Sequence, residues 1–95
     1  MAEITWSDWL DFSSEQISKI PAISGVFMMH AAMKILYIGG SANLKQAISE
    51  SLNNPCIKDA KRFKYSTLEN YDIIKIQLLQ EYQEKHGGSL PKCME

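Results

Sequence analysis

Two short apolar segments joined by a brief connection constrain the fold of this chain more than any other feature of its sequence. Residues 24–30 read SGVFMMH and residues 34–39 read KILYIG, and both are rich in β-branched and aromatic residues. Segments of this kind with so few residues between them predict an antiparallel hairpin. We therefore expect Phe27 and Tyr37 to lie close together, and the glycines that follow to break the second strand.

Apolar residues on either side of the hairpin recur at the spacing of a helix. Residues 6–10 place two tryptophans and a leucine at i, i+3 and i+4, which predicts one helical turn. Ser13 or Ser14 is a candidate cap for a second short helix that reaches Ile20. After the hairpin, Ser41 is expected to cap a helix in which apolar residues recur four positions apart.

The last third of the chain supplies one more strand and the clearest helix. Residues 63–69, FKYSTLE, predict a third strand. In residues 70–88, Ile74, Leu78 and Tyr82 recur at i, i+4 and i+8, and a glycine pair follows. The order of elements predicts an α+β fold with a small three-stranded antiparallel sheet flanked by helices.

Composition narrows the class of protein. With 95 residues, 45% apolar and 22% charged, the chain is expected to form one globular domain, residues 1–95. No apolar run approaches the roughly 20 residues that cross a membrane, and the acidic N-terminus is unlike a secretion signal. We therefore expect a cytosolic, cytoplasmic protein. Cys56 and Cys93 lack the partners of a zinc site, and a cytosolic location argues against a disulfide between two such buried or half-buried thiols.

The charges are unevenly distributed, although they nearly cancel to −1. Residues 19–64 hold seven basic and two acidic side chains, and the densest basic run is Lys58, Lys61, Arg62 and Lys64. An anionic partner, DNA or RNA, would bind here, because each phosphate contact releases counterions. On charge alone, a solvated face is an equal alternative.

Two spaced signatures give the hairpin a further meaning. GVF at residues 25–27 is followed ten residues later by YIG at residues 37–39. Together with the P-x-x-x-G-V-F lead-in, the S-x-N-L after YIG and the late helix LLQEYQEKHGGSLPKC, this pairing resembles the GIY-YIG nuclease domain. That domain occurs in homing endonucleases, in some restriction enzymes and in a bacterial excision-repair nuclease. The resemblance covers nearly the whole chain.

The resemblance implies a role for each position of a nuclease site. In the family, a hairpin tyrosine positions water, an arginine on the next helix binds the phosphate, and an asparagine near the C-terminus supports the site. The first tyrosine position corresponds to Phe27, and the second, Tyr37, is retained. The arginine position falls on Ala47 and the asparagine position on Met94.

A glutamate on the last long helix completes the family site by holding Mg²⁺, and its position decides what the resemblance implies about catalysis. That position falls on Lys75, or on Gln77 if the match to the family pattern is shifted by two residues. A lysine replaces attraction for the metal by repulsion. We therefore expect no metal, no cofactor and a degenerate, non-catalytic member of an enzyme family.

Three functions fit these observations. The first is a pseudo-enzyme that binds nucleic acid weakly, or assists a nucleic-acid-processing partner as in DNA repair. The second is a protein-interaction module on the nuclease scaffold. The third is a metal-dependent endonuclease with a displaced site that uses Glu81 and Lys45, although Glu81 falls about 240° round the helix from Lys75. The nucleic-acid-binding residues predicted for the first function are Gly39, Lys45, Lys58, Lys61, Arg62 and Lys64.

Overall fold

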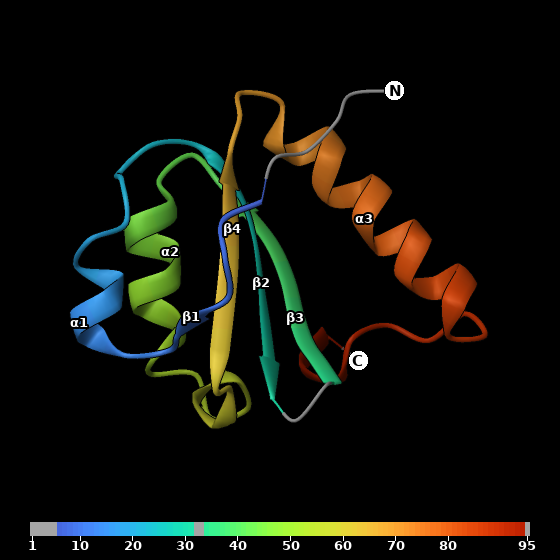
Figure 1. Ribbon diagram of the computed structural model, residues 1–95. Coiled ribbons are helices and arrows are strands. Elements are labelled where there is room, and N and C mark those ends of the chain that lie inside the picture. Colours follow the sequence, from blue (N-terminus) through green and yellow to red (C-terminus); the bar gives the residue numbers. More distant parts are fainter. Residues whose placement is uncertain (1–5, 32–33, 95) are drawn as a thin grey trace.

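The computed structural model describes residues 6–31 and 34–94, apart from the side chains of Lys58 and Lys92. The elements are β1 (Leu10–Asp11), α1 (Ser14–Ile17), β2 (Gly25–Ala31), β3 (Lys34–Ser41), α2 (Leu44–Ser51), the 3-10 turn η1 (Ile57–Asp59), β4 (Arg62–Thr67), α3 (Tyr71–Lys85) and the 3-10 turn η2 (Lys92–Met94). The strands form one antiparallel sheet in the order β1-β4-β2-β3 (Figure 1). The predicted α+β fold is confirmed, with four strands in the sheet instead of three.

The additional strand comes from the N-terminal segment, for which the sequence predicts a helical turn. Leu10 and Asp11 are extended and pair with β4, and the Ser7 N–H donates to the Tyr65 carbonyl at 2.9 Å. The helical prediction is wrong here. The apolar spacing supports only a single turn, which is costly to nucleate alone, whereas the edge of β4 offers ready backbone partners.

Strands β2 and β3 form the predicted hairpin, with Phe27 opposite Gly39. Residues 32 and 33, at its tip, lie outside the described part of the chain. The second strand continues through both glycines to Ser41, so the predicted break at this pair is wrong. Both glycines pair with β2 in the ladder, which supplies the backbone hydrogen bonds that hold them in the strand.

Helix α2 begins at Leu44, shortly after β3 ends at Ser41. Its N-cap is Asn43, whose side chain accepts a hydrogen bond from the Gln46 N–H. The predicted cap, Ser41, instead accepts from the Asn43 N–H at 3.0 Å and so shapes the approach to the helix. Leu44 and Ile48 are fully buried against the sheet, as their spacing predicts.

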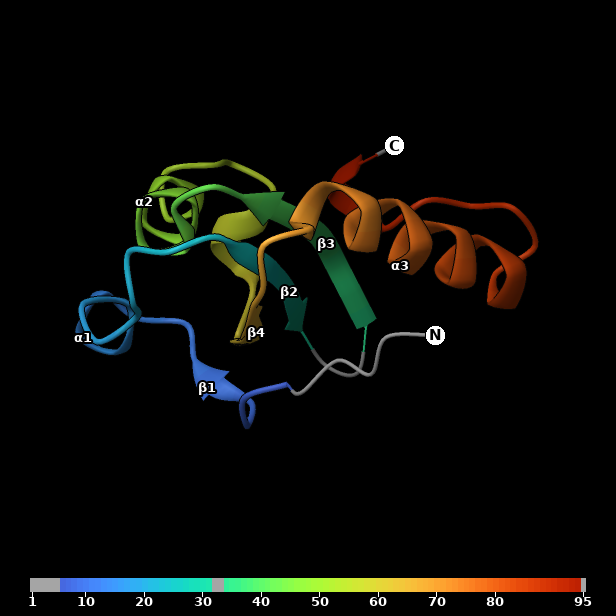
Figure 2. The same cartoon turned by 90° about the horizontal axis from the view of Figure 1, so that it is seen from above.

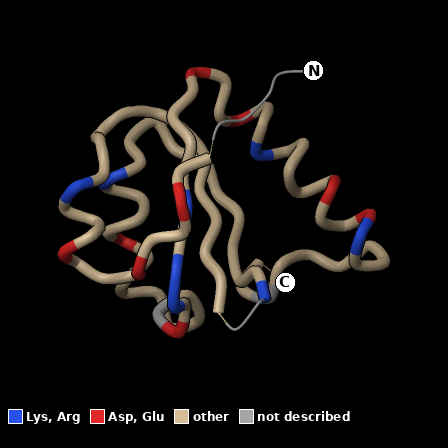
Figure 3. The backbone as a smooth tube through the Cα atoms, in the orientation of Figure 1, with Lys and Arg blue, Asp and Glu red and all other residues tan. Residues whose placement is uncertain are grey.

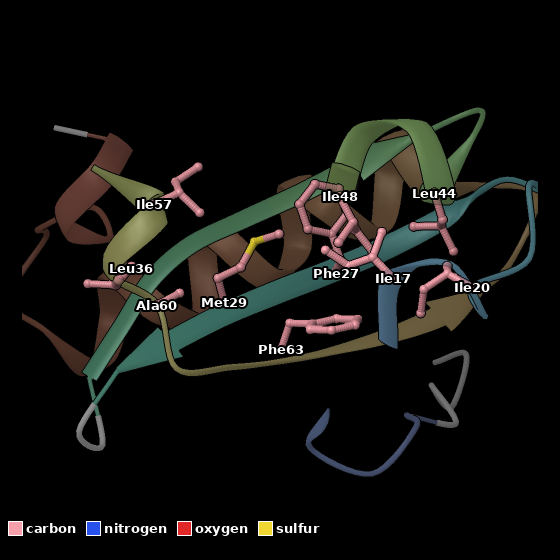
Figure 4. Close-up of a cluster of buried hydrophobic side chains, with 10 residues drawn as sticks. All are labelled: Ile17, Ile20, Phe27, Met29, Leu36, Leu44, Ile48, Ile57, Ala60 and Phe63. Carbon is pink, nitrogen blue, oxygen red and sulfur yellow. The ribbon is translucent and has the colours of Figure 1, made fainter. Parts of the chain in front are cut away.

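The helices cover both faces of the sheet. Helices α1 and α2 lie on one face and α3 lies on the other (Figures 1 and 2). The main core fills the space between the sheet and the α1–α2 layer (Figure 4). It consists of Ile17, Ile20, Phe27, Met29, Leu36, Leu44, Ile48, Ile57, Ala60 and Phe63.

Helix α3 is the predicted long helix. Its inner side buries Ile74 and Leu78 on the sheet, together with Val26 and Ile38 from the strands. Its outer side leaves Ile73 and Ile76 54% and 57% exposed. No helix in the described part of the chain is both long and apolar enough to cross a membrane.

A disulfide joins Cys56 and Cys93. This corrects the sequence-based expectation of two separate thiols. The C-terminal turn η2 packs along β3, and the chain leaving α2 brings η1 to the same region, so the two sulfurs meet across 37 residues of sequence. That proximity depends on tertiary packing, which the spacing of two isolated cysteines does not reveal.

Candidate functional site

A cleft opens between the hairpin and α2, on the α2 side of the sheet. Its volume is about 260 Å³. Three of the positions that the family resemblance points to, Phe27, Tyr37 and Ala47, line it together. We call it the Tyr37 cleft, and its full lining is Phe27, Tyr37, Gly40, Ser41, Ala47, Glu50, Ser51, Asn54 and Ile57.

Two aromatic rings form the hairpin wall of the Tyr37 cleft. The rings of Phe27 and Tyr37 are stacked, with centroids 5.8 Å apart and planes inclined by 22°. Their proximity confirms the sequence-based prediction. Gly39 makes room for the pair, since a Cβ there would stand 2.6 Å from Phe27 Cζ and from Tyr37 Cε1.

The opposite wall comes from α2 and the turn after it. Ala47, Glu50, Ser51 and Asn54 follow one another at i, i+3, i+4 and i+7, which places them on one face. Glu50 is the charged lining residue among the side chains that the structure describes. Sequence reasoning missed Glu50, although its position one turn beyond Ala47 is a signal that the same helical spacing contains.

Asn54 fixes the far end of this wall. Its Oδ1 accepts hydrogen bonds from the backbone N–H groups of Cys56, at 2.9 Å, and Ile57, at 3.2 Å. Ser51 is buried and donates its hydroxyl to the Ala47 carbonyl at 3.0 Å. The wall is therefore held in place by local hydrogen bonds and, just beyond them, by the disulfide.

Lys75, the position that the family resemblance assigns to a metal-binding glutamate, lies at the same end of β3. A Cβ on Gly40 would be 3.5 Å from Lys75 Cβ on α3, so Lys75 packs against this strand while Gln77 is exposed. Lys75 is half-buried and is not among the residues that line the Tyr37 cleft. A cationic side chain at this position does not fit a divalent metal.

The last family position, Met94, lies away from the cleft. Its Sδ accepts a hydrogen bond from the Ile38 N–H of the edge strand β3 at 3.5 Å. Its side chain packs with the cluster under α3. Met94 therefore covers the strand edge and takes no part in the aromatic pair.

The predicted basic residues are spread over several elements (Figure 3). Lys45 is exposed on α2, two positions before Ala47 and on another side of the helix. Lys61 and Arg62 are exposed where β4 begins, and an exposed ion pair of 3.8 Å joins Arg62 to Asp11. Lys58 lies in η1, and its side chain is outside the described part of the structure.

Lys64 differs from the other basic residues. Its Nζ lies 4.7 Å from the ring centroid of Trp6 and 4.8 Å from that of Trp9. Trp9 in turn stacks on His30 with ring centroids 4.1 Å apart. Burial lowers the pKa of Lys64 from its ordinary value of 10.5. Lys64 therefore packs against the two tryptophans of the N-terminal segment.

The residues of the displaced-site alternative are not brought together. Glu81 lines an apolar hollow of about 140 Å³ under the C-terminal half of α3, with neighbours that include Leu78 and Tyr82. Lys45 lies on α2, which covers the other face of the sheet. Within the described part of the chain, no three His, Cys, Asp or Glu side chains form a group that could hold a metal ion.

Comparison with protein-family models and with curated protein sequences finds no match. Among solved structures, the GIY-YIG N-terminal endonuclease domain of UvrC from Thermotoga maritima, bound to magnesium, matches with a TM-score of 0.66 and 19% identity. The match covers 83% of this chain and 91% of that one. A tyrosine-to-phenylalanine mutant of the same domain also matches, with a TM-score of 0.66, 19% identity and coverage of 83% and 90%. The match to an asparagine-to-alanine mutant has a TM-score of 0.65, 18% identity and the same coverage.

At these identities the likeness is one of fold. It agrees with the paired GVF and YIG signatures and with the order of strands and helices around them. This chain therefore has the fold of the GIY-YIG endonuclease domain, as its sequence predicts.

Proposed function

We propose that this chain is a non-catalytic, single GIY-YIG-like domain that binds nucleic acid weakly or assists a partner that processes it. The observation that carries the proposal is the pair of Ala47 in the Tyr37 cleft and Lys75 beside Gly40, at the position that the resemblance assigns to the glutamate. The first removes the cation that would stabilise a phosphate in the transition state. The second places a positive charge where a divalent metal would need a carboxylate.

Lys75 supports this proposal more strongly than Phe27 or Met94 does. The solved UvrC domains with a tyrosine changed to phenylalanine, or an asparagine changed to alanine, are both described as bound to their catalytic divalent cation. Changes of those two kinds therefore leave metal binding possible in that protein. A charge reversal at the metal ligand is a different kind of change, because it opposes binding of the cation directly.

Lys61 and Arg62 are the basic pair that we propose for nucleic-acid contact. Both are exposed and adjacent at the start of β4, and the ion pair of Arg62 with Asp11 is exposed enough for water and salt to weaken it. Lys64, held between two indoles, contributes less. Two phosphate contacts give weak affinity that falls about tenfold between 50 and 200 mM salt and depends little on sequence.

Titration of fluorescent single- and double-stranded 20-mers, read by anisotropy at several salt concentrations with and without Mg²⁺, tests the proposal. The Lys61→Ala/Arg62→Ala variant should reduce the salt slope by about two relative to the unchanged chain. Lys19→Ala/Lys85→Ala removes the same charge from exposed sites elsewhere and is the matched control. Equal losses in both variants would contradict the proposed contact, and Mg²⁺-dependent shortening of the oligonucleotides would contradict the absence of catalysis.

A protein-interaction module is the second candidate, and the exposed pair Ile73 and Ile76 favours it. Each exposes more than half of an apolar side chain, one turn apart on the outer side of α3. Absence of binding to either oligonucleotide at the lowest salt would favour this candidate over the first.

The proposal places the domain in the cytosol, where nucleic acid is accessible. The Cys56–Cys93 disulfide argues against that location, because cytosolic thiols are mostly kept reduced. Alkylation of thiols in intact cells, followed by mass measurement, tests the location. Two alkylated cysteines would support the cytosol, and an unmodified disulfide would contradict it.

A further inference from the structure

The Tyr37 cleft has one charged lining residue among the side chains that the structure describes, the carboxylate of Glu50. The helix that would present an arginine presents the methyl group of Ala47, and one turn later Glu50 brings a carboxylate to the same wall. The methyl group of Ala47 is small beside the cleft volume of about 260 Å³. The cleft therefore combines an exposed carboxylate at its rim with space for a positively charged group.

The lining indicates which cation fits. One wall is aromatic: Phe27 is buried in the main core, and the half-buried Tyr37 ring stacked on it gives a flat cation an aromatic surface to contact. The other wall carries Glu50, whose Oε1 accepts from Gln46 Nε2 at 3.2 Å and has further lone pairs free for a second donor. A guanidinium is planar, stacks on aromatic rings and donates two parallel hydrogen bonds to a carboxylate.

We propose that the Tyr37 cleft binds a guanidinium group, supplied either by a small guanidine or by the arginine side chain of a peptide. On the far wall, the hydrogen bonds that Asn54 Oδ1 accepts fix the turn beside the cleft without a bound group. A phosphate is disfavoured, since Glu50 repels it. A divalent metal is disfavoured as well, because no three potential ligands gather in the described residues. This binding is independent of the nucleic-acid contact proposed at Lys61 and Arg62.

Amide NMR shifts of the intact, disulfide-bonded chain measure the binding. The probes are N-acetyl-argininamide, its neutral citrulline counterpart, methylguanidine and Mg²⁺. The arginine probe should shift residues of the Tyr37 cleft saturably, and citrulline, which keeps the shape and loses the charge, should bind at least about tenfold more weakly. A stronger effect of the arginine probe than of methylguanidine would support a peptide source, and equal effects would support a small guanidine.

Three variants complete the experiment. Glu50→Gln should weaken the arginine probe about tenfold, while Glu84→Gln, an exposed carboxamide change on α3, should leave it unchanged. Ala47→Arg places the chain's own guanidinium in the cleft, three residues before Glu50, and should abolish binding. Normal unfolding curves for all three variants would show that they fold, so that a loss of binding in Glu50→Gln or Ala47→Arg comes from the cleft.

Several results would overturn the inference. Equal binding of the arginine and citrulline probes would show that the charge of the ligand is irrelevant. Unchanged binding in Glu50→Gln or Ala47→Arg would place the probe elsewhere. Saturable Mg²⁺ shifts at the cleft that compete with the arginine probe would identify a metal site instead. None of these results depends on whether the chain binds DNA or RNA.

Discussion

The two faces of the sheet are built differently. On the α1–α2 face, ten buried side chains form a continuous core, and Met29, Leu44, Ile48 and Phe63 are fully enclosed. On the α3 face, four buried side chains are completed by half-buried groups. The Tyr37 cleft opens beside the thicker core, whereas Lys75 lies on the thinner side. The continuous core on the α1–α2 face therefore does not depend on Lys75, which packs on the other face.

The matched variants Ile48→Ala and Ile74→Ala test this difference most directly. Both isoleucines face the sheet from a helix, at 0% and 3% exposure. We expect a loss of about 4 kcal/mol in the free energy of unfolding for Ile48→Ala and about 2 kcal/mol for Ile74→Ala. The thinner face relaxes more easily around the deleted atoms, because an open hollow lies beside Leu78. Urea denaturation measures both values, and equal losses would show that the two faces are energetically alike.

The disulfide links the two sides around the edge of β3, since Cys93 packs on the main core and the adjacent Met94 packs on the α3 cluster. A loop closed over 37 residues reduces the entropy of the unfolded chain. We expect Cys56→Ser/Cys93→Ser to cost about 3 kcal/mol. Reduction of the unchanged chain with dithiothreitol is the control and should give a similar loss. A loss below about 1 kcal/mol in both would show that packing alone holds the C-terminal turn.

The parts of the fold that were predictable from sequence have strong local patterns. The hairpin, α2 and α3 each follow from apolar spacing within one segment, and the Phe27–Tyr37 contact follows from hairpin register. The segment around Leu10 has a pattern compatible with two structures, and the free edge of β4 decides between them. No local pattern contains that information.

The candidate site was predictable to a smaller extent. Spacing within the family signatures identified Phe27, Tyr37 and Ala47, which do meet in one cleft. Glu50 has no counterpart in the signature, and its place one helical turn beyond Ala47 acquires meaning only once the cleft is seen. The two-tryptophan environment of Lys64 joins residues more than 50 positions apart, and charge runs along the chain cannot indicate it.

Neighbouring glycines on β3 sharpen the comparison of the two faces at single-residue level. A Cβ on Gly39 meets the buried Phe27 ring at 2.6 Å on the cleft side, whereas a Cβ on Gly40 meets Tyr71 at 3.2 Å on the α3 side. We expect Gly39→Ala to cost about 2 kcal/mol, because the stacked rings must move, and Gly40→Ala to cost about 1 kcal/mol or less. Urea denaturation measures the costs, and a reversed order would mean that the α3 side is the more rigid one.

Lys64 gives the smallest expected effect, and it is visible mainly in the dependence of stability on pH. Burial between Trp6 and Trp9 lowers its pKa in the folded state below the ordinary 10.5 of the unfolded chain. Between those two values the unfolded chain binds more protons, so rising pH through this window stabilises the folded state.

Lys64→Met should change stability by about 1 kcal/mol or less at pH 7, since lost cation–π contacts and relieved desolvation oppose each other. The variant should also lack the gain that the unchanged chain shows as pH approaches 10.5. Lys61→Met, at an exposed position, is the control and should keep that gain; if both variants follow the same pH curve, the indole rings do not shift the titration of Lys64.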